Sequence, residues 1–121
     1  MAKSYDEKHV TAFFKAHGIP EPMYEHKFAP LRKWRMDIAW IQQKVYCEVQ
    51  GGIWLMKKKT KAGKVYYTTG AHTKGKRLLK EWEKINTAST MGWRPIFVQP
   101  TDLLKQPTIE FVKAALLVEE A

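Results

Sequence analysis

The pattern of apolar and polar positions along the chain switches between the helical and the strand period and predicts the element order α-β-β-β-α-β-α. The first helix is expected within residues 4–18, where Val10, Phe13 and Phe14 form an apolar stripe and Gly18 is a C-terminal stop. Two later stretches with helical spacing follow, residues 73–91 and residues 107–120. This order indicates an α/β fold, a central mixed β-sheet flanked by helices.

Strand periodicity separates these helices. The predicted strands cover residues 24–29, 34–41, 44–50 and 93–99. Pro95 lies in the last of them, which favours a strand at an edge of the sheet or a strand start, because proline cannot donate a ladder hydrogen bond. Residues 51–72 are expected to be a long connection with a mobile, lysine-rich tip.

At 121 residues the chain is expected to form one domain, residues 1–121. No apolar run is long enough to span a membrane, and the N-terminus lacks the apolar core of a signal peptide. We therefore expect no membrane partner and a cytoplasmic location. The lone cysteine, Cys47, excludes an internal disulfide and a cysteine-based zinc finger, and it is expected to be a small buried apolar residue.

The positive charge is concentrated in one part of the chain. The formal net charge is +9, and residues 57–84 contain ten Lys or Arg residues but two Glu residues. Such clustering favours a polyanionic partner, and nucleic acid is the commonest one in the cytoplasm. The candidate DNA-binding residues are Arg35, Lys57, Lys58, Lys59, Lys61, His72, Lys74 and Lys76. For Arg35 a pairing with nearby acids is the alternative, and for His72 a hydrogen bond at a helix start.

Two carboxylates interrupt the apolar hairpin of residues 34–50. If its turn is centred on Gln42 and Gln43, the numbers of paired residues sum to 85, and Asp37 faces Glu48. Directly opposed like charges repel. Such a pair is tolerated if one carboxyl is protonated, if a cation from Arg35 or from a lysine of the next helix pairs with it, or if both share a metal ion. A salt-bridged structural pair is therefore one reading.

The other reading is a metal site. Oxygen ligands without a cysteine or histidine cluster suit a hard divalent ion, Mg²⁺ or Mn²⁺. Such an ion beside a basic surface can activate water and neutralise charge on a phosphate. This combination indicates a metal-dependent nuclease.

The same residues resemble the PD-(D/E)XK, or restriction-endonuclease-like, superfamily. Asp37, an intervening turn and then Glu48-Val49-Gln50 look like its D…(D/E)-X-K motif, and the order of residues 24–98 is similar to small stand-alone members, often phage or prophage encoded, near the VRR-NUC and very-short-patch-repair-like nucleases. The resemblance implies a restriction-endonuclease-like core over residues 24–98, with a basic loop region over residues 57–70.

By resemblance, Asp37 and Glu48 ligate the metal, with the Val49 carbonyl as a third ligand and Glu25 as a further one. The alternative for Glu25 is a surface glutamate near His26 and Lys27. Gln50 stands where the superfamily usually has lysine. It could orient the attacking water, while Lys84 or Lys76 of the following helix supplies the positive charge. Two further candidates lie outside this motif. Glu7 corresponds to a first-helix glutamate of many members, although capping with Ser4 explains it equally well. Trp54 is a candidate for stacking on a base. The other tryptophans are expected in the core, namely Trp34, Trp40, Trp82 and Trp93.

The sequence therefore predicts a Mg²⁺- or Mn²⁺-dependent DNA endonuclease, with Asp37, Glu48, Gln50 and Lys84 as catalytic residues. Small stand-alone relatives commonly act as homodimers, and several favour branched DNA. A structure-selective or Holliday-junction-resolving activity is accordingly the specific expectation, in the host cytoplasm if the chain is phage encoded. The alternative is a non-catalytic DNA-binding module that retains the nuclease fold.

Overall fold

The computed structural model describes residues 5–50, 55–69 and 75–118, and its helices and strands form a mixed α/β fold. In chain order the elements are α1 (Glu7–Ala16), β1 (Met23–Lys27), β2 (Arg35–Trp40), β3 (Val45–Val49), β4 (Leu55–Lys59), β5 (Val65–Thr69), α2 (Gly75–Thr90), β6 (Arg94–Val98), the 3-10 helix η1 (Pro100–Asp102) and α3 (Gln106–Leu116). The predicted order is therefore correct except for the extra strands β4 and β5 and the short helix η1.

The central sheet is mixed and has four strands in the order β1-β2-β3-β6. The pairs β1–β2 and β2–β3 are antiparallel, whereas β3 and β6 are parallel. A parallel pair needs a crossover connection, and the segment containing α2 supplies it. Strand β6 lies at one edge of this sheet, as Pro95 predicted.

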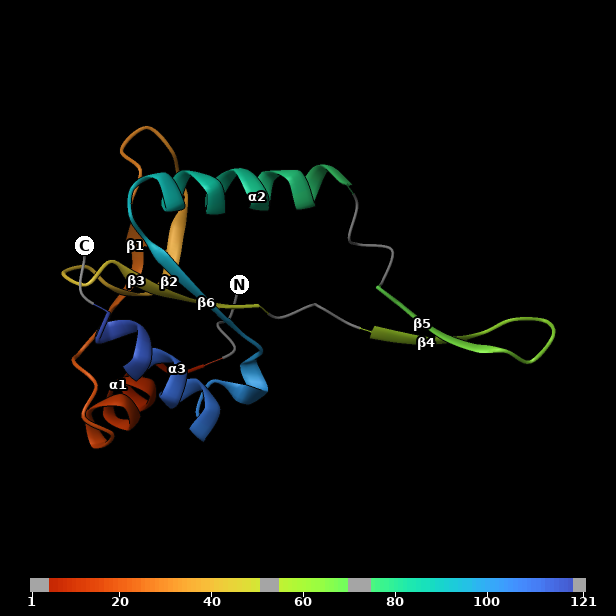
Figure 1. Cartoon of the computed structure of the whole chain (residues 1–121), viewed down its shortest axis with the longest axis horizontal. Coiled ribbons are helices and arrows are strands. Elements are labelled where there is room, and N and C mark those ends of the chain that lie inside the picture. Colours follow the sequence, from red (N-terminus) through yellow and green to blue (C-terminus); the bar gives the residue numbers. More distant parts are fainter. Residues whose placement is uncertain (1–4, 51–54, 70–74, 119–121) are drawn as a thin grey trace.

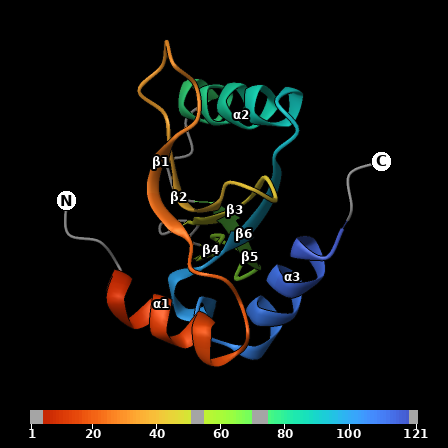
Figure 2. The ribbon, with the colours of Figure 1, turned by 90° about the vertical axis from the view of Figure 1, so that its left-hand side faces the viewer.

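Helices cover both faces of the sheet. Figures 1 and 2 show α2 along one face and α1 and α3 together on the other. The core on the α1 and α3 side contains fully buried Val10 and Phe14 of α1, Ile109 and Val112 of α3, and Val45 and Cys47 of β3. Burial of Cys47 in this core is as predicted, and it raises the pKa of its thiol to about 12.

Helix α1 confirms the predicted apolar stripe but begins later than expected. Its N-cap is Asp6, whose side chain accepts a hydrogen bond from the Lys8 N–H at 2.9 Å. The predicted cap, Ser4, lies outside the described residues, and capping by Asp6 replaces that interpretation. The helix ends as predicted, because Gly18 has a φ of +77°, a conformation that glycine adopts without steric cost.

Helix α2 differs from the prediction in what it buries. Among residues 78–90, whose side chains are described, Ala88 is the buried position, while Leu79 is 60% and Trp82 is 50% exposed. The expectation that Trp82 belongs to the core is wrong. Trp40 and Trp93 are buried as expected. Trp34 is partly buried and packs against a second group of buried residues, which includes Met36, Tyr46 and Trp93. In α2, Ala88 is buried and Lys84 and Ile85 are partly buried, whereas Leu78, Leu79 and Trp82 are exposed.

In the predicted basic loop region, residues 57–70, the described residues 57–69 do not form an irregular loop. Strands β4 and β5 pair antiparallel in a sheet of their own, from Leu55↔Thr69 to Lys59↔Val65. The run Val-Tyr-Tyr-Thr-Thr of β5 consists of β-branched and aromatic residues, which favour strands. Gly63, with a φ of +86°, donates its N–H to the Thr60 carbonyl at 2.9 Å and closes the turn. In Figure 1 this hairpin extends away from the four-stranded sheet.

Candidate functional site

The register of the β2–β3 hairpin is the one that the sequence predicted. The pairs Ile38↔Cys47, Ala39↔Tyr46 and Trp40↔Val45 each sum to 85. One step further along this register, Asp37 stands opposite Glu48. Because directly opposed residues have Cβ atoms about 5 Å apart, the fold brings two carboxyl groups together near the carboxyl end of β3.

Asp37 is half-buried and contacts the backbone of the neighbouring strand. Its Oδ2 accepts a hydrogen bond from the Val49 N–H at 2.8 Å. This hydrogen bond holds the Asp37 carboxylate against the backbone of β3 at Val49.

Glu48 is buried, with 7% of its surface exposed, and it contacts a cation from outside the hairpin. The Nζ of Lys84 lies 2.6 Å from Oε1 of Glu48 and donates a hydrogen bond to it. Lys84 belongs to α2, the helix that covers this face of the sheet, and both side chains are largely shielded from solvent. In such surroundings a charged contact is much stronger than at the surface.

The electrostatics of Glu48 reflect its burial and two neighbours. Together they raise the pKa of its carboxyl to about 8: burial raises the pKa most, Lys84 lowers it, and the charge of Asp37 together with a hydrogen bond between the two carboxyls raises it. The cation therefore offsets only part of the cost of burying two acids side by side. At neutral pH the carboxyl groups of Asp37 and Glu48 therefore favour holding one proton. A ligand that needs both carboxylates ionised would displace this proton.

Of the two lysines expected to supply a positive charge, Lys84 is the one that the structure brings to Glu48. The side chain of Lys76 lies outside the description. Gln50 directly follows β3, and its N–H donates to the Val98 carbonyl at 2.8 Å, which extends the contact between β3 and β6. Arg35 is exposed at the start of β2, two residues from Asp37.

Glu25 of β1 continues the line of Asp37 and Glu48 across the sheet, but its backbone conformation is unusual. The pairs Tyr24↔Ile38 and His26↔Met36 place it opposite Asp37 on the far side from Glu48. Its φ of +52° is rare for a residue with a side chain and disturbs the normal alternation of the strand. Among the described residues no three His, Cys, Asp or Glu side chains form a group able to hold a metal. Asp37 and Glu48 are the two acids that the register and the hydrogen bond between their carboxyls bring together, and they form the candidate site.

Tyr5 is a neighbour of the site that the sequence did not indicate. Burial raises the pKa of its hydroxyl, and the nearby charges of Asp37 and Glu25 add to this effect. Its ring packs at 6.4 Å, centre to centre, from that of Tyr24. Tyr5 precedes α1, where only the three-dimensional structure could place it beside strand residues.

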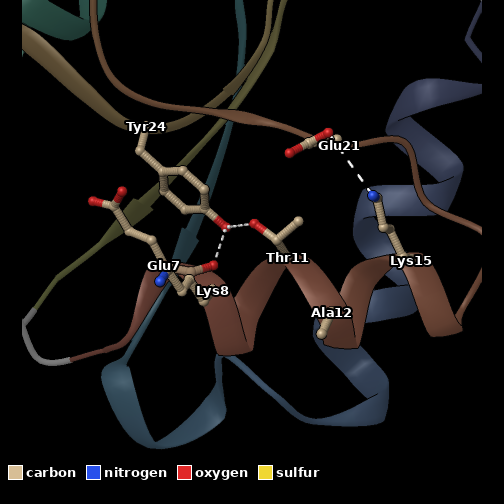
Figure 3. A pocket seen from close by; sticks show the side chains of 7 residues that line it. All are labelled: Glu7, Lys8, Thr11, Ala12, Lys15, Glu21 and Tyr24. Carbon is tan, nitrogen blue, oxygen red and sulfur yellow. Dashed lines mark hydrogen bonds and ion pairs between the residues drawn. The ribbon is translucent and has the colours of Figure 1, made fainter.

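Glu7 lines a surface hollow of about 400 Å³ between α1 and the start of β1 (Figure 3). Here the Tyr24 hydroxyl donates to the backbone carbonyl of Glu7 at 3.1 Å and lies 2.8 Å from the Thr11 hydroxyl. At the rim, Lys15 lies 3.9 Å from Glu21. The lining of this hollow includes neither Asp37 nor Glu48.

The remaining predicted DNA-binding residues are those of the β4–β5 hairpin and those that lie outside the described part of the chain. Lys57, Lys58 and Lys59 belong to β4, and Lys59 and Lys61 are exposed. His72 and Lys74 lie outside the described residues, as does Trp54, the candidate for base stacking. Within the part of the chain that is described, no helix is both long and apolar enough to cross a membrane.

Comparison of the chain with protein-family models, with curated proteins and with solved structures gave no match. The function must therefore be argued from the site itself.

Proposed function

We propose that the protein is a divalent-metal-dependent endonuclease that hydrolyses phosphodiester bonds in DNA. The observation that carries this proposal is the buried contact of 2.6 Å between Lys84 and Glu48, directly beside Asp37. Two acids and one lysine in a shielded position are the groups that the resemblance to the PD-(D/E)XK superfamily calls for. The lysine comes from α2 rather than from the position of Gln50.

The oxygen donors of this site suit Mg²⁺ or Mn²⁺. The Asp37 and Glu48 carboxylates and the Val49 carbonyl would hold the ion, since all three are hard ligands and two are acidic. When bound, the ion supplies a water of lowered pKa and neutralises charge on the phosphate. Its binding requires that Glu48 lose the proton that its raised pKa favours at neutral pH.

The residues of the chain then have separate tasks. Lys84 moves its ammonium from Glu48 toward the phosphate, where it donates hydrogen bonds to the oxygens that gain charge in the transition state. Asp37 is kept in place by the Val49 N–H, so that its free oxygen keeps one direction. Gln50 can orient the attacking water through its amide. The lysines from Lys57 to Lys61 hold the DNA backbone without reading its sequence.

A second candidate is a DNA-binding module without catalysis. The observation that favours it is again the Lys84–Glu48 contact, because the two side chains provide each other with a hydrogen-bond partner without a metal. In that case the acids serve the fold, and DNA binding relies on the lysines alone.

Nicking of supercoiled plasmid separates the two candidates. Wild type is assayed with Mg²⁺, with Mn²⁺ and with a chelator, beside Asp37→Asn and Lys84→Met. Lys80→Met is the matched control, because Lys80 is an exposed lysine one helical turn before Lys84. The nuclease proposal requires metal-dependent nicking that both site variants lose and the control keeps. Binding without nicking by all four proteins supports the module instead.

We extend the proposal to a homodimer that acts on branched DNA, as the resemblance implies. Cleavage of linear, flap and four-way-junction substrates of equal length tests the substrate, and sedimentation tests the dimer. Equal rates on all three substrates would contradict structure selectivity.

A further inference from the structure

The β4–β5 hairpin contributes little that the core of the domain needs. It forms a separate two-stranded sheet, and Figure 1 shows it reaching away from the body of the molecule. Two-stranded hairpins are marginally stable by themselves in water. A long hairpin that adds no strand to the central sheet is therefore best explained by something that it contacts.

Its charge identifies the kind of partner. Residues 55–69 contain five lysines and no acidic residue, so this short stretch carries five of the nine net positive charges. Lys59, Lys61 and Lys64 are exposed at and beside the turn. Lysines along an open strand edge disfavour pairing with a second copy of the same edge. They favour a polyanion, whose counterions are released on binding.

The shape of the hairpin fits duplex DNA. A two-stranded ribbon is one of the two protein elements that the major groove, about 12 Å wide, admits. Each strand has five residues, which corresponds to a length of about 17 Å at about 3.3 Å per residue. At about 3.4 Å per base pair, this length covers about five base pairs. Exposed Val65 and Tyr66, at 44% and 43%, offer apolar contacts to sugars and base edges between the lysines.

We propose that the β4–β5 hairpin is a DNA-binding arm that lies in the major groove of duplex DNA to one side of the acidic site. This inference rests on the proposed function, because it takes DNA to be the substrate. It adds that the substrate must be double-stranded over about five further base pairs on that side. A branched substrate would then be bound with one duplex limb along the arm.

The test compares two triple variants that lose the same charge. The arm variant is Lys59→Ala, Lys61→Ala and Lys64→Ala. The control variant changes Lys8, Lys105 and Lys113, three exposed lysines of the α1 and α3 side, to Ala. Binding of each protein to duplexes of increasing length is measured by fluorescence anisotropy at several salt concentrations.

For wild type and for the control, affinity should rise until the duplex includes the arm contact. The affinity of the arm variant should stop rising at a duplex length about five base pairs shorter than for wild type. The slope of log Kd against log salt should fall by about two to three, because three phosphate contacts are lost. Identical length dependence in all three proteins would overturn the proposal.

A second variant replaces residues 57–67 with Asn-Gly, which joins the two strands at the pair Met56↔Thr68 through a tight turn. Its melting temperature should match wild type, and it should show the same early limit of affinity. If this variant instead sediments at half the mass of wild type, the hairpin joins two copies of the chain and the inference is wrong.

The failure of this inference can be told apart from the failure of the proposed nuclease. If nicking depends on metal but the arm and control variants bind DNA equally well, the proposed nuclease stands and the proposed arm is wrong. If affinity depends on duplex length through the arm but no metal supports nicking, the proposed arm stands and the proposed nuclease is wrong.

Discussion

The ammonium of Lys84 lies 2.6 Å from the carboxylate of Glu48, although 36 positions separate the two residues in the chain. A helix residue thereby reaches a buried acid in the middle of a sheet, beside a second acid, Asp37. Whether this contact is a structural ion pair or part of a metal site is what the first prediction tests.

Replacing Lys84 with Met should reduce plasmid nicking at least a hundredfold, which corresponds to about 3 kcal/mol of barrier. Stability should change little, because Glu48 without Lys84 has an even higher pKa and stays protonated at neutral pH. Nicking assays and thermal melts of Lys84→Met and Lys80→Met measure both effects. If the pair is purely structural, Lys84→Met should lose about 3–5 kcal/mol of stability instead, as broken buried ion pairs do.

The metal-free protein should become less stable as the pH rises from about 5 to about 8. Glu48 has a folded pKa of about 8, above its unfolded value of 4.5, so the folded state holds the extra proton. The stability that this proton confers is complete below the unfolded pKa and is lost as the pH passes through the folded one. Melting temperatures of wild type and Glu48→Gln in the presence of a chelator test this. The Gln variant should show a flatter profile over this range, and parallel profiles would contradict the raised pKa.

Asp37→Asn should preserve the fold but weaken metal binding. The amide oxygen of Asn can still accept the Val49 N–H, while the charge that attracts the ion is lost. With Mg²⁺ at a hundred times its Kd, wild type should gain about 2.7 kcal/mol of stability. Melts with and without Mg²⁺ should show this gain in wild type and little of it in Asp37→Asn. Equal stabilisation of both proteins would place the ion elsewhere.

Trp40 of β2 and Trp82 of α2 differ in burial and should respond differently to replacement by alanine. Trp40 is 2% exposed and donates its indole N–H to the Pro20 carbonyl at 2.9 Å, so Trp40→Ala should cost about 3–5 kcal/mol. Trp82 is 50% exposed on α2, and Trp82→Ala should change stability by less than about 1 kcal/mol. Chemical denaturation of both variants measures the difference. A large loss for Trp82→Ala would mean that another surface covers α2.

The sequence by itself determined the local parts of the site. Alternation along the strands and a turn at Gln42 and Gln43 fixed the register, because a slip by one residue would turn every apolar side chain of the hairpin to the wrong face. That register set Asp37 against Glu48. The strand edge at Pro95 and the burial of Cys47 followed from equally local rules.

Only the tertiary structure decided which lysine meets Glu48, since that choice depends on how α2 crosses the sheet. It also placed Tyr5 beside the acids and exposed Trp82. The β4–β5 hairpin was missed because a lysine-rich stretch reads as a loop when cross-strand pairing is unknown. Periodicity reports which side of an element is apolar, whereas contacts between distant elements arise from packing, which no single stretch of sequence encodes.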